Sequence, residues 1–225
     1  KPVSVHAFIG TWWNTEGAMD RNFDVGLALR PASNVSLQLG PSFSHGESSA
    51  QHVTAVDDPT AVTFFGRRYV FADIEQNTIG MDLRVNWTFS PTLTLELYAQ
   101  PFVSSGRYSS FKEFAQPRGL EKLVYGADVG TIQEEDGAYT IDPDGTGLAA
   151  PFAVGNPDFN FRSIRGNAVL RWEFRPGSTL FLVWTQSRSD TEPVGTMSIG
   201  HDLGALFRAP SDNIFMVKVN YWIGM

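Results

Sequence analysis

The sequence predicts an all-β protein, an antiparallel transmembrane β-barrel, and three observations support this prediction. Apolar and polar residues alternate with a period of two along several segments, the pattern of strands with one apolar and one polar face. Short proline-containing turns join these segments in pairs, and the apolar parity is kept across each turn. The polar positions include charged side chains, which fill a packed soluble core poorly. A barrel with lipid outside and a polar lumen satisfies all three.

The clearest hairpin runs from Asn77 to Val103, with the turn at Phe89-Ser90-Pro91-Thr92. Its odd positions are apolar on both arms, whereas its even positions include Asp82, Arg84 and Glu96. We expect Arg84 and Glu96 to lie opposite each other across the two arms. Both arms then present one apolar face to the same medium.

Four further segments share this alternation. Hairpins are expected over 22–39 and 164–186, and single strands over 3–13 and 214–223. The total is about eight strands, each of roughly 9–11 residues as a tilted membrane crossing requires.

The connections separate into two kinds within a single domain spanning 1–225. Three tight turns and both termini are expected at one end, and long surface loops at about 46–72, 104–160 and 187–212 at the other. Short turns opposite long loops are typical of bacterial outer-membrane barrels. In the loops we expect a strand pair, 123–129 with 138–141, and a single helical turn at 202–208.

Aromatic residues gather near the tight-turn end. They predict an aromatic girdle at a membrane interface, formed by Trp87, Phe89, Trp172, Phe174, Tyr221 and Trp222. The alternative is that aromatic residues are simply common in strands.

The charged residues at polar strand positions are the candidates for lining a lumen. They are Asp82, Arg84, Glu96, Arg165, Arg171, Glu173 and Lys218. Such a surface could pass or bind hydrophilic solutes. Alternatively, the side chains could form ion pairs that merely fill a narrow barrel.

Composition argues against several other classes of protein. The net charge of -7 and the lack of a basic patch argue against nucleic-acid binding. The chain has no cysteine, which excludes disulfides and thiolate metal sites. Its four histidines are scattered and no nucleophile motif appears, so we expect neither enzyme activity nor a cofactor. Asp142 and Asp144 are weak candidates for a calcium loop, since the full alternating ligand spacing is absent.

Three long stretches carry a family resemblance: LYAQPFVSSGRYSSFKEFAQPR, FNFRSIRGNAVLRWEFRPGSTLFLVWTQSRSD and HDLGALFRAPSDNIFMVKVNYW. They resemble the C-terminal barrel region of an uncharacterised bacterial outer-membrane family, which usually carries an N-terminal module similar to family 9 carbohydrate-binding domains. The resemblance implies a larger barrel, whose remaining strands come from a missing N-terminal part or another chain. The alternative is that about eight strands close on themselves.

These observations favour a porin-like or transport-associated protein of the bacterial outer membrane, with the lipid bilayer and a glycan as expected partners. Two other functions stay open. One is a soluble, lipocalin-like ligand-binding barrel with its apolar residues inside. The other is a structural membrane anchor for an absent module.

Overall fold

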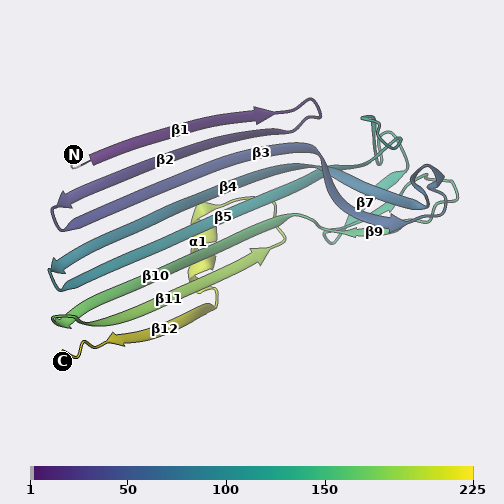
Figure 1. The fold of residues 1–225 in the computed structure, drawn as a ribbon. Helices are drawn as coiled ribbons and strands as arrows, with labels where there is room; N and C mark the ends of the chain where they lie inside the picture. The colour runs from purple at the N-terminus through teal and green to yellow at the C-terminus, as the bar shows by residue number, and fades with distance from the viewer. Residues whose placement is uncertain (1–2, 225) are drawn as a thin grey trace.

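The computed structural model describes residues 3–224, and these residues form mainly antiparallel β-structure (Figure 1). Eight long strands make the main sheet in the order β1-β2-β3-β4-β5-β10-β11-β12. Their bounds are β1 Val3–Trp13, β2 Met19–Ala32, β3 Val35–Asp57, β4 Arg67–Ser90, β5 Leu93–Phe114, β10 Phe159–Arg175, β11 Ser178–Glu192 and β12 Ser211–Asn220. The prediction of an all-β antiparallel fold with about eight long strands is confirmed.

Shorter elements fill the connections at the far end. Strand β6 (Lys122–Val124) pairs with β5, while β7 (Thr131–Glu135), β8 (Ala138–Asp142) and β9 (Phe152–Gly155) form a small separate sheet. A 3-10 turn, η1, spans Val62–Phe64, and a helix, α1, spans Ile199–Arg208. No helix in residues 3–224 has the length and hydropathy needed to cross a membrane.

Two predictions for the long loops need correction. The segment 138–141 is a strand, but its partner is β7 and not 123–129. After β6 the chain instead bends at Gly126, whose positive φ of 79° suits a glycine in a tight turn. The helical turn expected at 202–208 is the C-terminal part of the longer helix α1.

The three tight turns lie at one end of the sheet, together with the start of β1 and the end of β12 (Figure 1). Each turn has two residues between the closing pair, which is Ala32 with Val35, Ser90 with Leu93, or Arg175 with Ser178. We call this the tight-turn end and the opposite one the distal end. Within the described residues, the three tight turns therefore share one end of the sheet.

The long loops are shorter than the sequence predicts because five strands continue into them. The predicted loop 46–72 is mostly the paired ends of β3 and β4, which are connected only by 58–66. Likewise β5 and β10 reduce the loop 104–160 from both sides, and β11 extends into 187–212. Bulges between Ser48 and Gln51 and between His52 and Thr54 shift the register of β3. Each bulge interrupts the period-two alternation and so conceals the strand in the sequence.

The main sheet is open. Within residues 3–224, β1 pairs only with β2 and β12 only with β11, so both edge strands keep a row of unpaired backbone groups. The prediction that about eight strands close into a barrel by themselves is therefore wrong for the described chain. An edge of this length normally pairs with another strand or is covered.

A buried core occurs only at the distal end of the described chain. It joins the distal parts of β4 and β5 to the turn after β6 and to β8 and β9, and consists of Val70, Ala72, Phe111, Tyr125, Ile141 and Val154. We call the distal parts of β3, β4 and β5, together with the connection 58–66 and β6–β9, the distal cap. The rest of the main sheet, which we call the open sheet, is a single layer apart from helix α1 on one face.

Candidate functional site

One face of the open sheet carries all seven predicted lumen residues. The register places Arg84 opposite Tyr98, Arg165 opposite Gln100, and Lys218 opposite Phe181. Following these pairs across β4, β5, β10, β11 and β12 puts the seven side chains at positions of one parity. We call this side the polar face and the other side the apolar face.

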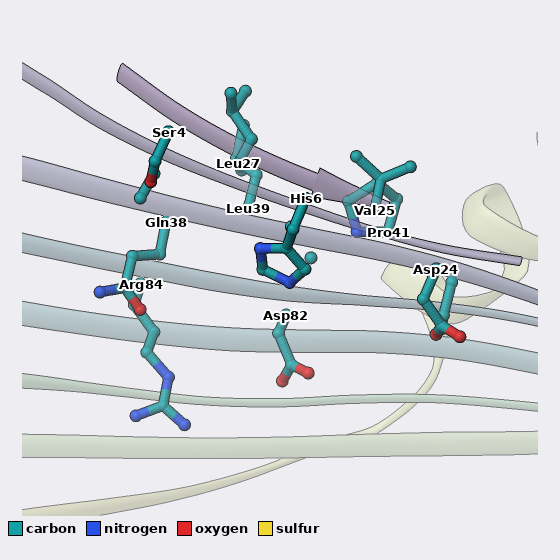
Figure 2. A pocket seen from close by; sticks show the side chains of 14 residues that line it. Ser4, His6, Asp24, Val25, Leu27, Gln38, Leu39, Pro41, Asp82 and Arg84 are labelled. Atoms are coloured by element: carbon teal, nitrogen blue, oxygen red, sulfur yellow. The ribbon is translucent and has the colours of Figure 1, made fainter. Parts of the chain in front are cut away.

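The polar face is hollowed between β1 and β4. A hollow of about 510 Å³ is lined there by side chains that include Ser4, His6, Asp24, Asp82 and Arg84 (Figure 2). The His6 ring lies across β2, and a Cβ at its partner Gly26 would come within 1.8 Å of the His6 Cε1 atom. Glycine at this position therefore makes room for the imidazole ring.

Tyr98 connects two charged residues beside this hollow. Its hydroxyl group donates a hydrogen bond to Asp82 Oδ1 at 3.0 Å, and the Arg84 guanidinium lies 5.0 Å from its ring centroid. Arg84 therefore faces Tyr98, and Glu96 pairs with Asn86, which corrects the expected Arg84–Glu96 pairing. The turn is centred on Pro91 and Thr92, one residue later than expected, and this moves the register.

A second hollow of about 360 Å³ adjoins the first and includes Arg84, Glu96 and Asn167 in its lining. Among the seven candidates in the described chain, Arg171 and Glu173 form an ion pair at 3.6 Å, and both side chains are partly exposed. The other charged groups are thus free to meet water or a solute. A surface of this kind presents hydrogen-bond donors, hydrogen-bond acceptors and charges of both signs.

The apolar face has no cover over most of its area. One ladder crosses all eight strands through apolar residues alone: Val3, Leu29, Leu37, Val85, Leu97, Ala168, Trp184 and Phe215. None of these eight side chains is buried, and Phe215 is 75% exposed. The apolar side chains do not converge on a dry interior, so the described residues do not form the closed calyx of a lipocalin.

The apolar region of this face, which we call the apolar band, does not extend equally far along every strand. On β1 to β5 its distal margin is one ladder formed by Ile9, Phe23, Phe43, Ile79 and Val103. The same ladder continues as Arg162 on β10 and Asp190 on β11, so there the apolar band stops nearer the tight-turn end. The margin is therefore perpendicular to the strands from β1 to β5, and on β11 and β12 it lies nearer the tight-turn end, at Trp184 and Phe215.

All six predicted girdle residues lie at the tight-turn end and are exposed. Trp87 and Phe89 stack with ring centroids 4.5 Å apart, and Trp172 lies 6.0 Å from Phe174. These four rings and Tyr221 have the parity of the apolar face. Trp222 has the opposite parity, and its backbone N–H donates to Ser178 Oγ.

Helix α1 is fixed to the apolar face by a buried arginine that sequence reasoning missed. Arg162 is fully buried, and its Nη1 donates to Asp202 Oδ1 on α1 at 2.9 Å. Its Nε donates to Asp190 Oδ2 at 2.9 Å, and Glu192 completes the cluster. Burial disfavours ionisation of Asp202, but hydrogen bonds from Ser198, Asn160 and His201 and the charge of Arg162 outweigh it, so the pKa of Asp202 is lowered.

A second charged cluster stabilises the distal cap. Arg68 bonds Asp58 and Glu113, and the Tyr125 hydroxyl group donates to Glu113 at 2.8 Å. Burial and the neighbouring Glu113 carboxylate raise the pKa of Tyr125. Burial opposes ionisation of Asp58, yet hydrogen bonds from Thr60 and Arg68 hold its pKa below the usual range. These groups are mutually satisfied and mark a structural cluster.

No group of metal ligands is found among residues 3–224, and His45 and His201 have carboxylate or amide partners. His201 lies 3.3 Å from Asp202, and His45 bonds Asn77 and Glu47, but in these residues no serine hydroxyl is hydrogen-bonded to a histidine. Asp142 and Asp144 accept backbone N–H groups of their own turn. Across residues 3–224 no group of three or more His, Asp or Glu side chains is arranged to hold a metal ion, so the calcium hypothesis has no ligand set.

Sequence reasoning also missed His6 and Tyr98 as site residues. Both lie at polar-face positions of strands it did predict. The sequence did carry a signal for this site. Gly26 and Gly40 occupy even positions on neighbouring strands, and a glycine within a strand often marks a place where another group approaches the backbone closely.

Comparison with known proteins gives a family but no activity. The model of a family described as Domain of unknown function (DUF5916) matches residues 2–225. No curated protein matches the chain. Among solved structures, BauA, the ferric preacinetobactin receptor from Acinetobacter baumannii, is similar at 13% identity and a TM-score of 0.41. That match covers 89% of this chain and 27% of the receptor chain.

Proposed function

The chain belongs to the DUF5916 family, and we propose that it forms part of the wall of a porin-like or transport-associated β-barrel in the bacterial outer membrane. The polar face lines the lumen and the apolar face contacts lipid. The uncovered apolar ladder across all eight strands is the observation that carries this proposal. Exposing so large a continuous apolar surface to water is costly, whereas hydrocarbon accepts it.

The position of the aromatic residues supports the same arrangement. The exposed aromatic residues at the tight-turn end then lie where a periplasmic girdle belongs.

The open edges require partners in a membrane, because hydrocarbon satisfies no backbone N–H or C=O group. We assign the outer edges of β1 and β12 to further strands of the same barrel, supplied by a missing N-terminal region or by another chain. The exposed side chains of β12, such as Val217 at 66%, lie along one of these edges.

The chemistry of the two hollows on the polar face supports a hydrophilic solute. Carboxylate, guanidinium, imidazole and phenol groups border them, and this mixture suits an uncharged or zwitterionic hydrophilic molecule such as a glycan. Removing one charge should change how solutes pass and leave the fold intact, because Arg84 is exposed.

Membrane insertion is tested by purifying the chain together with the strands that complete its barrel, with and without detergent. We expect folded β-structure only in detergent micelles or lipid vesicles, and aggregation in plain buffer. A chain that is monodisperse and folded in detergent-free buffer contradicts the proposal.

Transport is tested by conductance in planar bilayers, using the full-length protein that supplies the remaining strands. Arg84→Glu should shift the ion selectivity towards cations, whereas Phe65→Ser, in the distal cap, should not. A protein that inserts but passes no ions would instead be a structural anchor with a filled lumen.

A further inference from the structure

Helix α1 lies across the apolar face, at the distal margin of the apolar band (Figure 1). Its N-terminal end is near β3 and β4, where Ile199 shares a hollow of about 410 Å³ with Phe43 and Asn77. Its C-terminal end is near β11, where Arg188 Nη1 donates to the Phe207 carbonyl oxygen at 2.5 Å. The helix therefore crosses the strands from the β4 side towards β12.

The helix has two different flanks. Asp202 and Leu206 are fully buried against the sheet. Ile199, Leu203 and Phe207 follow one another at intervals of four residues and so form one apolar stripe. Ile199 is 57% exposed and Phe207 is 62% exposed, so the protein does not cover this stripe.

The handedness of the helix decides where the stripe points. In a right-handed helix each residue advances by about 100°, so Leu203 is a quarter turn from Asp202, which faces the sheet. Since α1 runs from the β4 side towards β12 on the apolar face, this quarter turn points to the tight-turn end. The apolar stripe thus faces the apolar band, beside Phe43 at its margin, and His201 and Arg208 lie on the distal flank.

We infer that α1 is an interfacial helix whose stripe of Ile199, Leu203 and Phe207 contacts the lipids of the outer leaflet. The inference rests on the proposed function, because the apolar band next to the stripe must itself face lipid. The stripe adjoins the apolar band, so the edge of one hydrocarbon layer would contact both Phe43 and the stripe. We therefore take lipid as the partner of the stripe. A helix with an apolar side in hydrocarbon and a polar side in the headgroup region is the arrangement of peripheral membrane helices.

The chain has no cysteine, which allows single nitroxide labels to be placed without background. Four variants are reconstituted in phosphatidylcholine vesicles: Phe207→Cys on the stripe, His201→Cys on the opposite flank of the same helix, Leu97→Cys on the apolar ladder, and Phe65→Cys in the distal cap. Paramagnetic accessibility is then measured with oxygen, which concentrates in lipid, and with a water-soluble nickel chelate. All four positions are exposed, so each variant should fold.

We expect an oxygen-to-nickel accessibility ratio at position 207 that is several-fold above that at 201 and 65 and below that at 97. If the label at position 207 gives the same water-exposed ratio as the label at 65, while the label at 97 gives a lipid-exposed ratio, the interfacial helix is refuted and the proposed function stands. If position 97 is aqueous as well, the proposed function and this inference both fail. A position 207 shielded from both reagents would show protein contact, by a second copy or another chain, and would also overturn the inference.

Discussion

The open sheet and the distal cap are built from the same strands, β3, β4 and β5, yet they bury their side chains in different ways. In the distal cap alternate residues of β4, such as Val70 and Ala72, are completely buried under β8 and β9. Twelve residues further along the same strand, Asp82 and Arg84 stand on a face with no second layer. The strand is the same in both regions, and the difference in burial comes from whether a second layer of the protein packs on it.

Their charged groups differ in the same way. In the distal cap Arg68, Asp58 and Glu113 satisfy one another with little exposure. In the open sheet Glu96 and Arg84 are exposed and line hollows. Buried charges must be paired, whereas charges facing water need not be. The distal cap therefore buries and pairs its own groups, whereas the described chain leaves most of the apolar face of the open sheet uncovered.

The largest expected difference comes from deleting core atoms. Ile141→Ala removes a fully buried side chain from the distal cap and should cost about 2–5 kcal/mol of the cap's free energy of unfolding. Leu39→Ala on the apolar face should cost less in vesicles, because mobile lipid chains can fill the space. Hydrogen exchange of the β8 and β9 amides measures the loss in Ile141→Ala. Urea titration in vesicles measures the loss in Leu39→Ala. Equal losses would show that the apolar face is packed like the cap.

A charge on each face of the open sheet tests which of them meets lipid. Leu83→Arg on the apolar face should cost roughly 2–4 kcal/mol of folding free energy in vesicles, the penalty for arginine near a bilayer midplane. Asn86→Arg, on the polar face of the same strand, should cost little because water hydrates it. Urea titration of folding into vesicles measures both, and similar costs would contradict the assignment of faces.

The open sheet was predictable because its alternation is local. Period-two patterning determined the strands, the tight turns and the face on which all seven charged candidates lie. The single error there, Arg84 opposite Glu96, came from a turn centre one residue off. Register depends on such a detail, and the sequence gives it only approximately.

The distal cap and α1 were harder because their interactions are not local. The bulges after Ser48 break the alternation that revealed the other strands. Arg162 and Asp202 are forty residues apart in sequence, and nothing near either residue marks them as a buried pair. Whether the sheet closes was likewise undetermined, since it depends on strands that pair at the two edges.

A third comparison uses acid. Because the pKa of Asp58 is lowered in the folded cap, its stabilising contribution is present above the unfolded-state pKa of ~3.9 and is lost as the pH falls through the folded-state value. The free energy of unfolding of the cap, measured with denaturant, should therefore be constant from neutral pH to about pH 5 and should fall at lower pH. Asp58→Asn should reduce the loss of cap stability in acid. Asp57→Asn, which changes an exposed neighbouring carboxylate, should leave that loss unchanged. An unchanged acid profile for Asp58→Asn would exclude this carboxylate as the source.

The smallest effect concerns the aromatic residues at the tight-turn end. Trp87→Ala removes a ring that stacks on Phe89 and should reduce stability in vesicles by about 1 kcal/mol, the usual range for an aromatic pair. Trp12→Ala is the matched control, because Trp12 is similarly exposed but has the parity of the polar face. If the two residues lie in the same environment, both substitutions should cost the same. A clear loss for Trp87 alone, with its fluorescence quenched by lipids brominated near the headgroup, would place the girdle residue in the interface and separate the two faces at single-residue resolution.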